Sequence, residues 1–284
     1  MMSDSGHDFL KVEGIGNDFL LFDRLELHEA EILQELAAFT AAAPTWCDRE
    51  SGVGGDGLLI VCRADDERAL AKQIVINHDG SRPEMCGNGL RCVAHFIAQR
   101  RNSEHFLVET DAGLLDCALL SAAATADAQV SVNMGAPREL GRTLPSAGNG
   151  RSFVGVSMGN PHAIHFVADD EDPEQLARSL GPGLEVDAAY PERSNIEFAR
   201  LEEDGSITLW VWERGCGITQ ACGTGACATA VAAVWEGHRP PGTWIRVALP
   251  GGELAIRVPQ DESAGIEMRG AATQNFRGRV SLPA

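Results

Sequence analysis

The sequence of 284 residues contains almost no lysine. Lys11 and Lys72 are the only two, although arginine brings the basic total to 23. Enzymes that racemise amino acids through pyridoxal phosphate hold this cofactor as a Schiff base on a lysine. Neither lysine stands in a sequence context typical of phosphate binding. The composition therefore argues against that cofactor, and no other cofactor is predicted.

Long apolar runs and an apolar leader are also missing. No run approaches the ~18–20 residues that a membrane span requires, and residues 1–9 are polar and acidic, unlike a secretory signal. Acidic residues number 41 and the net charge is −18, so the surface repels nucleic acid and anionic membranes. We therefore expect a cytoplasmic protein that binds neither. The sequence leaves the oligomeric state open, with a homodimer among the alternatives.

The eight cysteines contain no Cys-x-x-Cys pair, which argues against a metal site or an iron–sulfur cluster. Without a signal sequence, reduced thiols are expected rather than a disulfide framework. Core packing is the favoured role for Cys92 and Cys227, because a free cysteine behaves as a small apolar residue.

Short runs rich in Val, Ile, Leu, Phe and Trp, bounded by Gly, Asp or Pro, predict a strand-rich protein. The predicted strands are 11–23, 58–62, 73–77, 106–110, 129–133, 153–157, 163–167, 195–201 and 206–212, with a hairpin of 244–248 and 253–258. Apolar periodicity predicts helices over 29–39, 88–99 and 224–236. A further helix begins after Asp172 as its cap and ends at Gly181.

A four-residue pattern occurs twice, each time after strands and before a predicted buried helix. Cys86-Gly87-Asn88-Gly89 is the first copy and Cys222-Gly223-Thr224-Gly225 is the second. This repetition favours an α+β fold of two similar halves, each strand-rich around one helix. We predict an N-terminal half at 1–127, a C-terminal half at 128–273, and a segment at 274–284 that either stands alone or returns to the N-terminal half.

The pattern places a thiol at the start of a helix, where unpaired N–H groups and the helix dipole favour an anion. Such a position lowers the pKa of a cysteine from about 8.5 to about 7 or below. Two such sites predict a pocket lined by two activated thiols. This pair suits inversion at an amino-acid α-carbon, because a thiolate removes the α-proton while a thiol delivers another to the opposite face. The two cysteines then titrate as a pair.

The chain resembles diaminopimelate epimerase in four segments, which are 14–19, 77–92, 159–162 and 213–225. The resemblance implies two pseudo-symmetric domains, each a strand-rich barrel around a central helix, with the active site in the cleft between them. It also implies interconversion of LL- and meso-diaminopimelate in lysine biosynthesis, by two cysteines and without cofactor or metal.

The same resemblance implies a role for each matching residue. The two bases are Cys86 and Cys222. Backbone donors to the α-carboxylate come from Gly87, Asn88, Gly223 and Thr224. The side chains that hold the substrate ammonium are Asn17, Asn160 and Glu213, with His162 close by. Those that grip the distal carboxylate are Asn77, Asn195 and Arg214, whose planar guanidinium suits a carboxylate.

The residues alone leave other functions open. A proline or hydroxyproline racemase uses the same paired thiols, but its substrate has no distal carboxylate for Asn195 and Arg214. In a thiol redox protein, Cys86 and Cys222 cycle between dithiol and disulfide. An amino-acid binding protein is the third alternative. The expected partner is a small-molecule amino-acid substrate in every case except the redox protein.

Overall fold

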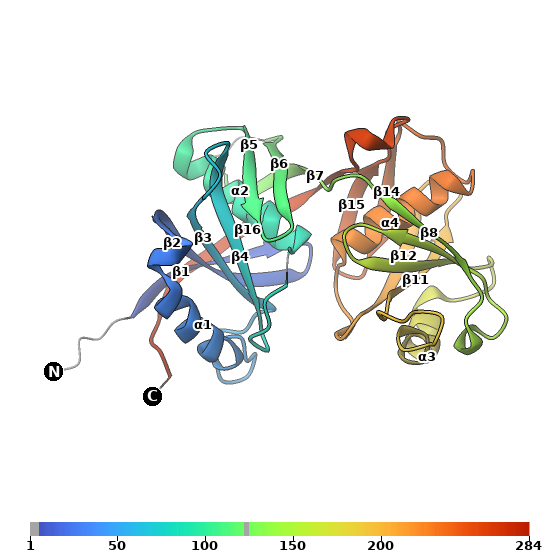
Figure 1. The fold of residues 1–284 in the computed structure, drawn as a ribbon, viewed down its shortest axis with the longest axis horizontal. Helices are drawn as coiled ribbons and strands as arrows, with labels where there is room; N and C mark the ends of the chain where they lie inside the picture. Colours follow the sequence, from blue (N-terminus) through green and yellow to red (C-terminus); the bar gives the residue numbers. More distant parts are fainter. Residues whose placement is uncertain (1–5, 84, 122–124, 284) are drawn as a thin grey trace. The chain divides into compact units, whose positions relative to one another are not determined.

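A computed structural model describes residues 6–83, 85–121 and 125–283, so residues 1–5 and 284, at the outer ends of the predicted segments, lie outside it. The chain divides into two compact units (Figure 1). The first unit consists of two segments, the chain up to Val132 and the chain from Gly270 onward. The second unit is Asn133–Arg269. The boundaries predicted from the sequence were 127/128 and 273/274. Each unit is described by itself.

The strands of the first unit close on themselves. They are β1 (His7–Gly14), β2 (Asn17–His28), β3 (Gly57–Arg63), β4 (Ala69–Asn77), β5 (His105–Thr110), β6 (Gly113–Leu119), β7 (Asp127–Asn133) and the later part of β16 (Glu267–Val280). They pair in this order, and β16 pairs with both β7 and β1. The result is a strand-rich barrel, as predicted.

The second unit has the same strand order, but among the described residues no pairing joins its first strand, β8, to its last, β16. Its strands are β8 (Arg138–Thr143), β9 (Phe153–Ser157), β10 (Pro161–Phe166), β11 (Asn195–Leu201), β12 (Ile207–Glu213), β14 (Trp244–Leu249), β15 (Gly252–Arg257) and the first part of β16. They again pair in this order. A short strand, β13 (Gly217–Ile218), pairs with the end of β12.

Seven successive strand pairs have the same orientations in the two units, and the β7–β16 pair that closes the first unit has no counterpart among the described pairs of the second. From β16–β1 to β6–β7 the pairs are antiparallel, antiparallel, parallel, antiparallel, parallel, antiparallel and antiparallel. From β8–β9 to β15–β16 the sequence of pairs is the same. The structure therefore confirms the predicted repeat and the α+β class, and it allows positions in one unit to be matched to positions in the other.

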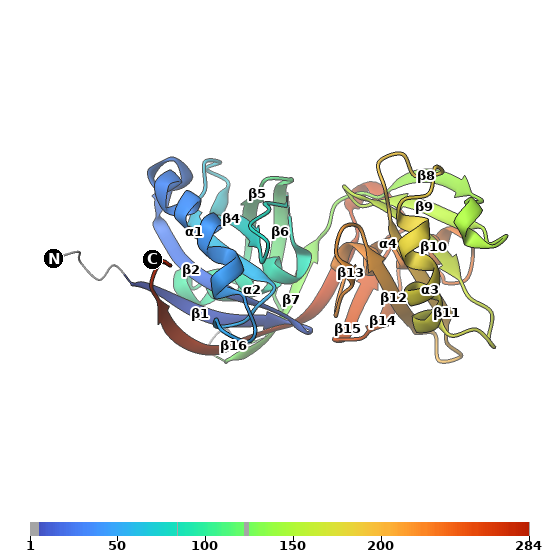
Figure 2. The same cartoon turned by 90° about the horizontal axis from the view of Figure 1, so that it is seen from below.

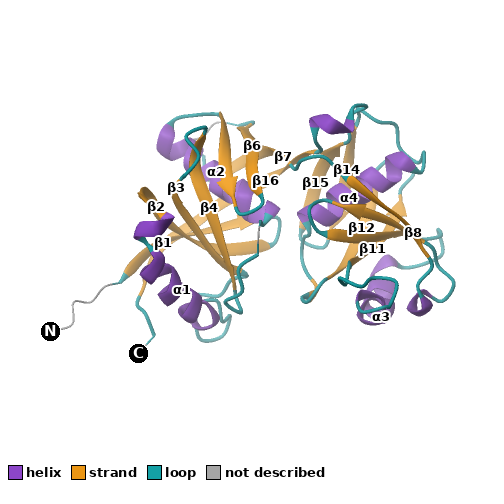
Figure 3. Cartoon of the chain, viewed as in Figure 1, coloured by secondary structure: helices purple, strands orange, loops and turns teal. Residues whose placement is uncertain are grey.

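Each unit wraps its strands around one helix and carries a second helix on the outside (Figures 1 and 2). The inner helices are α2 (Gly87–Arg101), which contacts β1, β2, β3, β4 and β6, and α4 (Gly223–Trp235), which contacts β9, β10, β11, β14 and β15. The outer helices are α1 (Leu33–Trp46) and α3 (Pro173–Glu185). Figure 3 shows the purple inner helices among the orange strands. Three short 3₁₀ turns complete the structure at η1 (Glu29–Glu31), η2 (Ser146–Gly148) and η3 (Glu262–Ala264).

The outer helices rest on apolar clusters. Phe39 and Trp46 of α1 pack with Phe22 of β2, and Leu184 of α3 belongs to a cluster with Phe198 of β11. Among the described residues, every helix is too short or too polar to cross a membrane.

Several predicted elements were wrong in extent. The predicted strand 11–23 is two strands, because Ile15 and Gly16 adopt φ of 50° and 83° and turn the chain back. The predicted helix 29–39 is a 3₁₀ turn followed by α1, which continues to Trp46. Strands β6, β8 and β16 were missed, since their polar or mixed composition lacks a long apolar run.

Helix α3 does not end at Gly181 as predicted, although Asp172 caps it by accepting a hydrogen bond from the Glu174 N–H at 2.9 Å. The helix continues to Glu185. A Cβ on Gly181 would lie 2.6 Å from Trp212 of β12. This glycine is therefore required for close packing of the helix on the strand and not for ending the helix.

The chain offers a matched pair of glycines for testing this packing. Gly181→Ala should lower the free energy of unfolding by about 1–3 kcal/mol, the usual effect of overpacking a core. Gly183→Ala, whose Cβ would lie 3.5 Å from Ala147, should leave stability unchanged or raise it by up to about 1 kcal/mol, the helix-propensity gain over glycine. Denaturant unfolding of both variants measures the difference. Equal stability of the two would contradict the close contact with Trp212.

Candidate active site

In the first unit, Cys86 caps the inner helix. Its backbone is extended, with φ of −132°, and its Sγ accepts a hydrogen bond from the Gly89 N–H at 3.4 Å. The helix that follows is buried from Gly87 to Ala98, while Cys86 itself is partly exposed. The thiol thus lies at the helix N-terminus, at the point where the buried helix meets accessible space. Cys92, further along the helix, is buried as predicted for core packing.

Two predicted site residues meet beside this thiol. Asn88 donates its side-chain N–H to Oδ1 of Asn17, and Asn17 in turn donates to Oδ2 of Asp56 at 3.1 Å. Arg49 donates to the other oxygen of Asp56 at 2.9 Å. Asp56 therefore fixes the orientation of Asn17, and this role was missed. Its position directly before β3, in Gly-Gly-Asp-Gly, is the signal that could have indicated it.

Asn77 lies at the same edge of the first unit as the start of β2. Phe19 is paired with Gly57, and Gly57 with Asn77, so β2 and β3 begin where β4 ends. The Asn77 side chain donates to Oγ of Ser81 at 2.9 Å. Its contact with a distal carboxylate stays a prediction from the sequence.

In the second unit, Cys222 caps the other inner helix by the same geometry. Its Sγ accepts a hydrogen bond from the Gly225 N–H at 3.4 Å, and the Thr224 hydroxyl lies 3.6 Å from the same sulfur. Unlike Cys86, Cys222 is only 5% exposed. Gly223 begins the helix and is buried beside it.

The electrostatic environment of Cys222 is opposite to the prediction. Burial raises the pKa of the Cys222 thiol well above its ordinary range, and the acidic side chains of Glu213 and Glu197, when ionised, raise it further. The hydrogen bonds from Thr224 and the Gly225 N–H lower the pKa but do not outweigh these effects. The predicted activation by the helix N-terminus was therefore wrong for this cysteine, because desolvation and two nearby acids dominate.

Glu213 stands at the end of β12, and its carboxylate accepts a hydrogen bond from the Thr219 hydroxyl. Desolvation raises the pKa of Glu213, while its hydrogen bonds with Thr219 and Cys222 lower it. The acid predicted to meet a substrate ammonium thus lies within hydrogen-bonding reach of the second thiol.

A polar chain connects Asn160 and His162 to a residue that the sequence did not single out. His162 Nδ1 lies 2.6 Å from Oε1 of Glu197, and His162 Nε2 lies 2.9 Å from Oδ1 of Asn160. Asn160 donates from Nδ2 to Oγ1 of Thr224 at 3.4 Å. Glu197 was missed because its strand, β11, reads as apolar and a lone acid in such a run gives no signal of burial.

Asn195 and Arg214 also lie together in the second unit. The Arg214 N–H donates to Oδ1 of Asn195 at 2.9 Å, and Asn195 donates to the Pro161 carbonyl at 2.8 Å. The Arg214 side chain is exposed and its Nη1 donates to the Glu192 carbonyl at 3.2 Å. Its guanidinium is therefore oriented by one backbone group and keeps further donors for a ligand.

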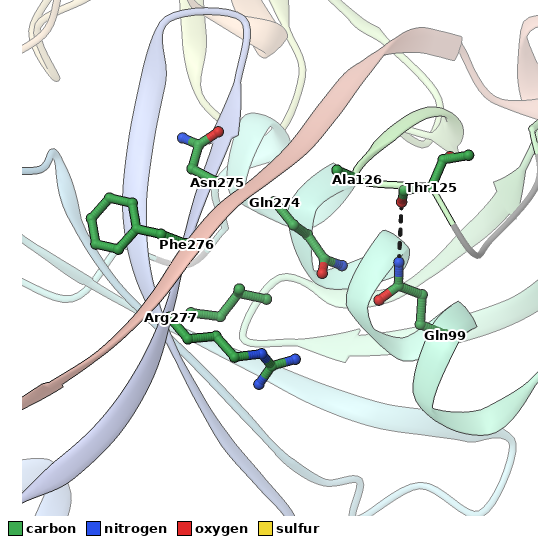
Figure 4. A pocket seen from close by; sticks show the side chains of 8 residues that line it. Gln99, Thr125, Ala126, Gln274, Asn275, Phe276 and Arg277 are labelled. Atoms are coloured by element: carbon green, nitrogen blue, oxygen red, sulfur yellow. Dashed lines mark hydrogen bonds between the residues drawn. The ribbon is translucent and has the colours of Figure 1, made fainter.

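A pocket of about 350 Å³ in the first unit contains none of these residues. Its lining includes Gln99, Gln274, Phe276 and Arg277, and Gln99 donates to the Thr125 carbonyl at 3.2 Å (Figure 4). Within the described part of the chain, no three His, Cys, Asp or Glu side chains gather as a set of metal ligands.

Comparison with known proteins identifies the family. The family model for diaminopimelate epimerase matches residues 9–140 and 154–274. The chain is 38% identical to the diaminopimelate epimerase of Heliobacterium modesticaldum, covering 97% of this chain and 100% of that protein. It is also 38% identical to that of Bacillus cytotoxicus, covering 94% and 95%.

Solved structures agree on the fold. A hydroxyproline epimerase from Agrobacterium vitis superposes with a TM-score of 0.73 at 15% sequence identity, over 100% of this chain and 95% of that one. At 15% identity this likeness shows only that the fold is shared. The family model and the sequence relatives match over most of the chain and show the family. The chain belongs to the diaminopimelate epimerase family.

Proposed function

We propose that the protein interconverts LL- and meso-diaminopimelate by a two-base mechanism in which Cys86 and Cys222 act on opposite faces of one α-carbon. The observation that carries this proposal is the repeated cap, in which each Sγ accepts the N–H of the second glycine of its motif. Membership of the family supports the substrate, and lysine biosynthesis is the pathway that this substrate supplies. No cofactor is required by the mechanism.

The α-proton is only weakly acidic, so its removal requires stabilisation of the charge that moves onto the α-carboxylate. The first turn of a helix offers N–H groups that the helix cannot satisfy internally, together with the positive end of its dipole. Gly87 and Asn88 supply this turn in the first unit, and Gly223 and Thr224 supply it in the second. The two turns act on the reacting carboxylate at the moment its charge increases.

Protons balance over a turnover. A thiolate takes the α-proton and becomes a thiol, and the electron pair of the broken C–H bond delocalises into the carboxylate. The opposing thiol then forms the new C–H bond and is left as a thiolate. The enzyme ends with its proton on the other cysteine, ready for the reverse reaction.

The remaining residues hold the substrate. Asn17, Asn160 and Glu213 meet the ammonium, since they present amide and carboxylate oxygens beside the two caps. Asn77, Asn195 and Arg214 hold the distal carboxylate. A two-carboxylate substrate is thereby distinguished from proline, which lacks the distal group.

Removal of either thiol should abolish turnover. Cys86→Ala and Cys222→Ala leave one face of the α-carbon without an acid or a base, so conversion of LL- to meso-diaminopimelate should fall below detection. The measurement is ¹H NMR in D₂O with reduced protein and no added cofactor, following loss of the α-proton signal and appearance of the meso isomer.

Cys216→Ser is the matched control and should keep wild-type activity. This exposed cysteine lies in the same unit as Cys222 but outside the helix cap. Full activity in either cap variant would exclude the two-thiol mechanism. Exchange of proline but not of diaminopimelate by the wild type would identify a proline racemase instead.

The distal grip depends on the guanidinium of Arg214. Arg214→Lys replaces a planar fork by a point charge, and losing one charge-assisted hydrogen bond should raise KM roughly 10-fold or more with a smaller effect on kcat. Steady-state kinetics on diaminopimelate measures the split. Arg178→Lys, an exposed arginine that pairs with Glu174 on α3, is the control and should match the wild type. An unchanged KM for Arg214→Lys would remove this residue from the binding site.

The raised pKa of Cys222 predicts its reactivity. A pKa above the ordinary value keeps the group protonated through neutral pH, so alkylation of Cys222 by iodoacetamide should rise at higher pH than that of exposed Cys216. Glu213→Gln removes one negative charge beside the sulfur and should move the Cys222 curve to lower pH. Mass spectrometry of the modified peptides gives both curves in one sample. A Cys222 curve that coincides with that of Cys216 would contradict the effect of burial.

A further inference from the structure

The two units differ in the side chains that lie beneath the capping thiols. A Cβ on Gly89 would lie 2.8 Å from Cδ2 of Leu59, whereas a Cβ on Gly225, the same position in the second motif, would lie 3.1 Å from Oε1 of Glu197. Leu59 and Glu197 are both fully buried. Leu59, with the amide nitrogen of Gln73 at 3.3 Å from the same Cβ position, therefore lies beneath the first cap, and the carboxyl group of Glu197 lies beneath the second.

The strand register extends this correspondence to the neighbouring position. Phe19 is paired with Gly57 across the parallel pair β2–β3, and His162 is paired with Asn195 across the parallel pair β10–β11. Leu59 lies two residues after Gly57 on β3, and Glu197 lies two residues after Asn195 on β11. The first unit thus contains a phenylalanine and a leucine where the second contains a histidine and a glutamate.

The contacts of His162 determine where its protons are. Asn160 donates from Nδ2 to Thr224, so the Asn160 atom that faces His162 is the oxygen Oδ1, which can only accept. With Asn160 in this orientation, His162 Nε2 donates to Oδ1 and carries a hydrogen. At 2.6 Å, His162 Nδ1 and Oε1 of Glu197 must also share a proton, since two lone pairs would repel each other at this distance. In a neutral imidazole that carries its hydrogen on Nε2, this proton belongs to the Glu197 carboxylic acid, which donates to Nδ1.

Glu197 has little freedom to do anything else. Its second oxygen, Oε2, accepts the Ala163 N–H at 3.1 Å, and its side chain, like that of His162, is fully excluded from solvent. The carboxyl group is thus held by a backbone donor on one side and by the imidazole on the other, directly beneath the Cys222 cap.

We propose that Glu197 is a positioning residue for the reaction: it holds His162 in the tautomer that donates from Nε2, and His162 thereby orients Asn160 beside Thr224 and Cys222. This inference rests on the proposed function, which assigns Asn160 to the substrate ammonium. A flipped tautomer would place two acceptors, Nε2 and Oδ1, against each other, and Asn160 would lose its orientation.

Two substitutions of similar size separate this role from simple filling of space. In Glu197→Gln the amide donates to His162 Nδ1 and accepts the Ala163 N–H, so the tautomer is kept and kcat should stay within about 3-fold of wild type. Glu197→Leu provides no partner for Nδ1, and kcat should fall on the order of 10-fold or more, as expected for a lost hydrogen bond to a site residue, with KM changing less.

Asp187→Asn is the control for altering a buried carboxylate of the second unit. Asp187 accepts from Ser146, Ala147 and Ala189, none of which belongs to the site, so its kcat should equal that of the wild type. Wild-type kcat in Glu197→Leu, or equal loss of kcat in the Gln and Leu variants, would overturn the proposal.

A spectroscopic measurement reads the tautomer directly. ¹⁵N NMR of histidine-labelled wild-type protein without substrate should give His162 Nε2 as a protonated nitrogen, and the same signal should persist in Glu197→Gln but not in Glu197→Leu. A bare, accepting Nε2 in the wild type would overturn the proposal. This result does not depend on turnover, so failure of the proposed function, recorded as no α-proton exchange by the wild type, is distinguished from failure of this inference.

If Glu197→Leu does not fold, the double variant His162→Phe/Glu197→Leu replaces it. This variant copies Phe19 and Leu59, a pair that the same scaffold already accommodates in the first unit. It should fold with a Tm close to that of the wild type and lose kcat at least as strongly as the single variant, because Asn160 has no donor from position 162. Wild-type kcat in the double variant would overturn the proposal.

Discussion

The structure depends on one constraint, which is that the first turn of each inner helix lies largely buried within its unit. A buried helix end needs partners for its first N–H groups. In both units a cysteine sulfur accepts the N–H of the second glycine. The glycines are required because a Cβ at Gly89 or Gly225 would meet the strand beneath or the thiol itself. The stability of the helix and the position of the reactive sulfur are therefore consequences of the same contact.

The repeated topology explains why two thiols have the same geometry, and the side chains beneath them explain why they are not equivalent. The order of parallel and antiparallel pairs is the same in both units, so each cap is reached by the starts of two parallel strands and the end of a third. Asn17 and Asn160 occupy corresponding strand starts and bond to the first helical turn in each case. The second unit adds buried carboxylates near its cap, and these, together with burial, make Cys222 a weaker acid than an isolated cysteine.

Local patterns predicted much of this from the sequence, and long-range effects account for what was missed. Cys86 and Cys222 as helix caps, the Asp172 cap and most core strands follow from turn and capping residues close in the chain. Strand β16 was missed because its mixed composition lacks a long apolar run and its residues belong to both units. Gly181 was predicted to end a helix. The residue that requires a glycine there is Trp212, which is distant in sequence, so no local pattern indicates the contact. The acidity of Cys222 was predicted with the wrong sign because desolvation depends on packing that no local motif encodes.

Burial is the main cause of the raised pKa of Cys222, and of the two acids that raise it further, Glu213 is the one proposed to bind the substrate. Glu213 raises the pKa of the thiol through its negative charge, and an ammonium ion placed beside Glu213 offsets that charge. Under this proposal, binding of a zwitterion weakens one of the effects that raise the pKa of the thiol, while the effect of burial remains. An amino acid without its ammonium would leave the carboxylate uncompensated and the sulfur protonated. In the proposed mechanism, recognition of the ammonium by Glu213 and a lower pKa of the Cys222 thiol are then parts of the same electrostatic event.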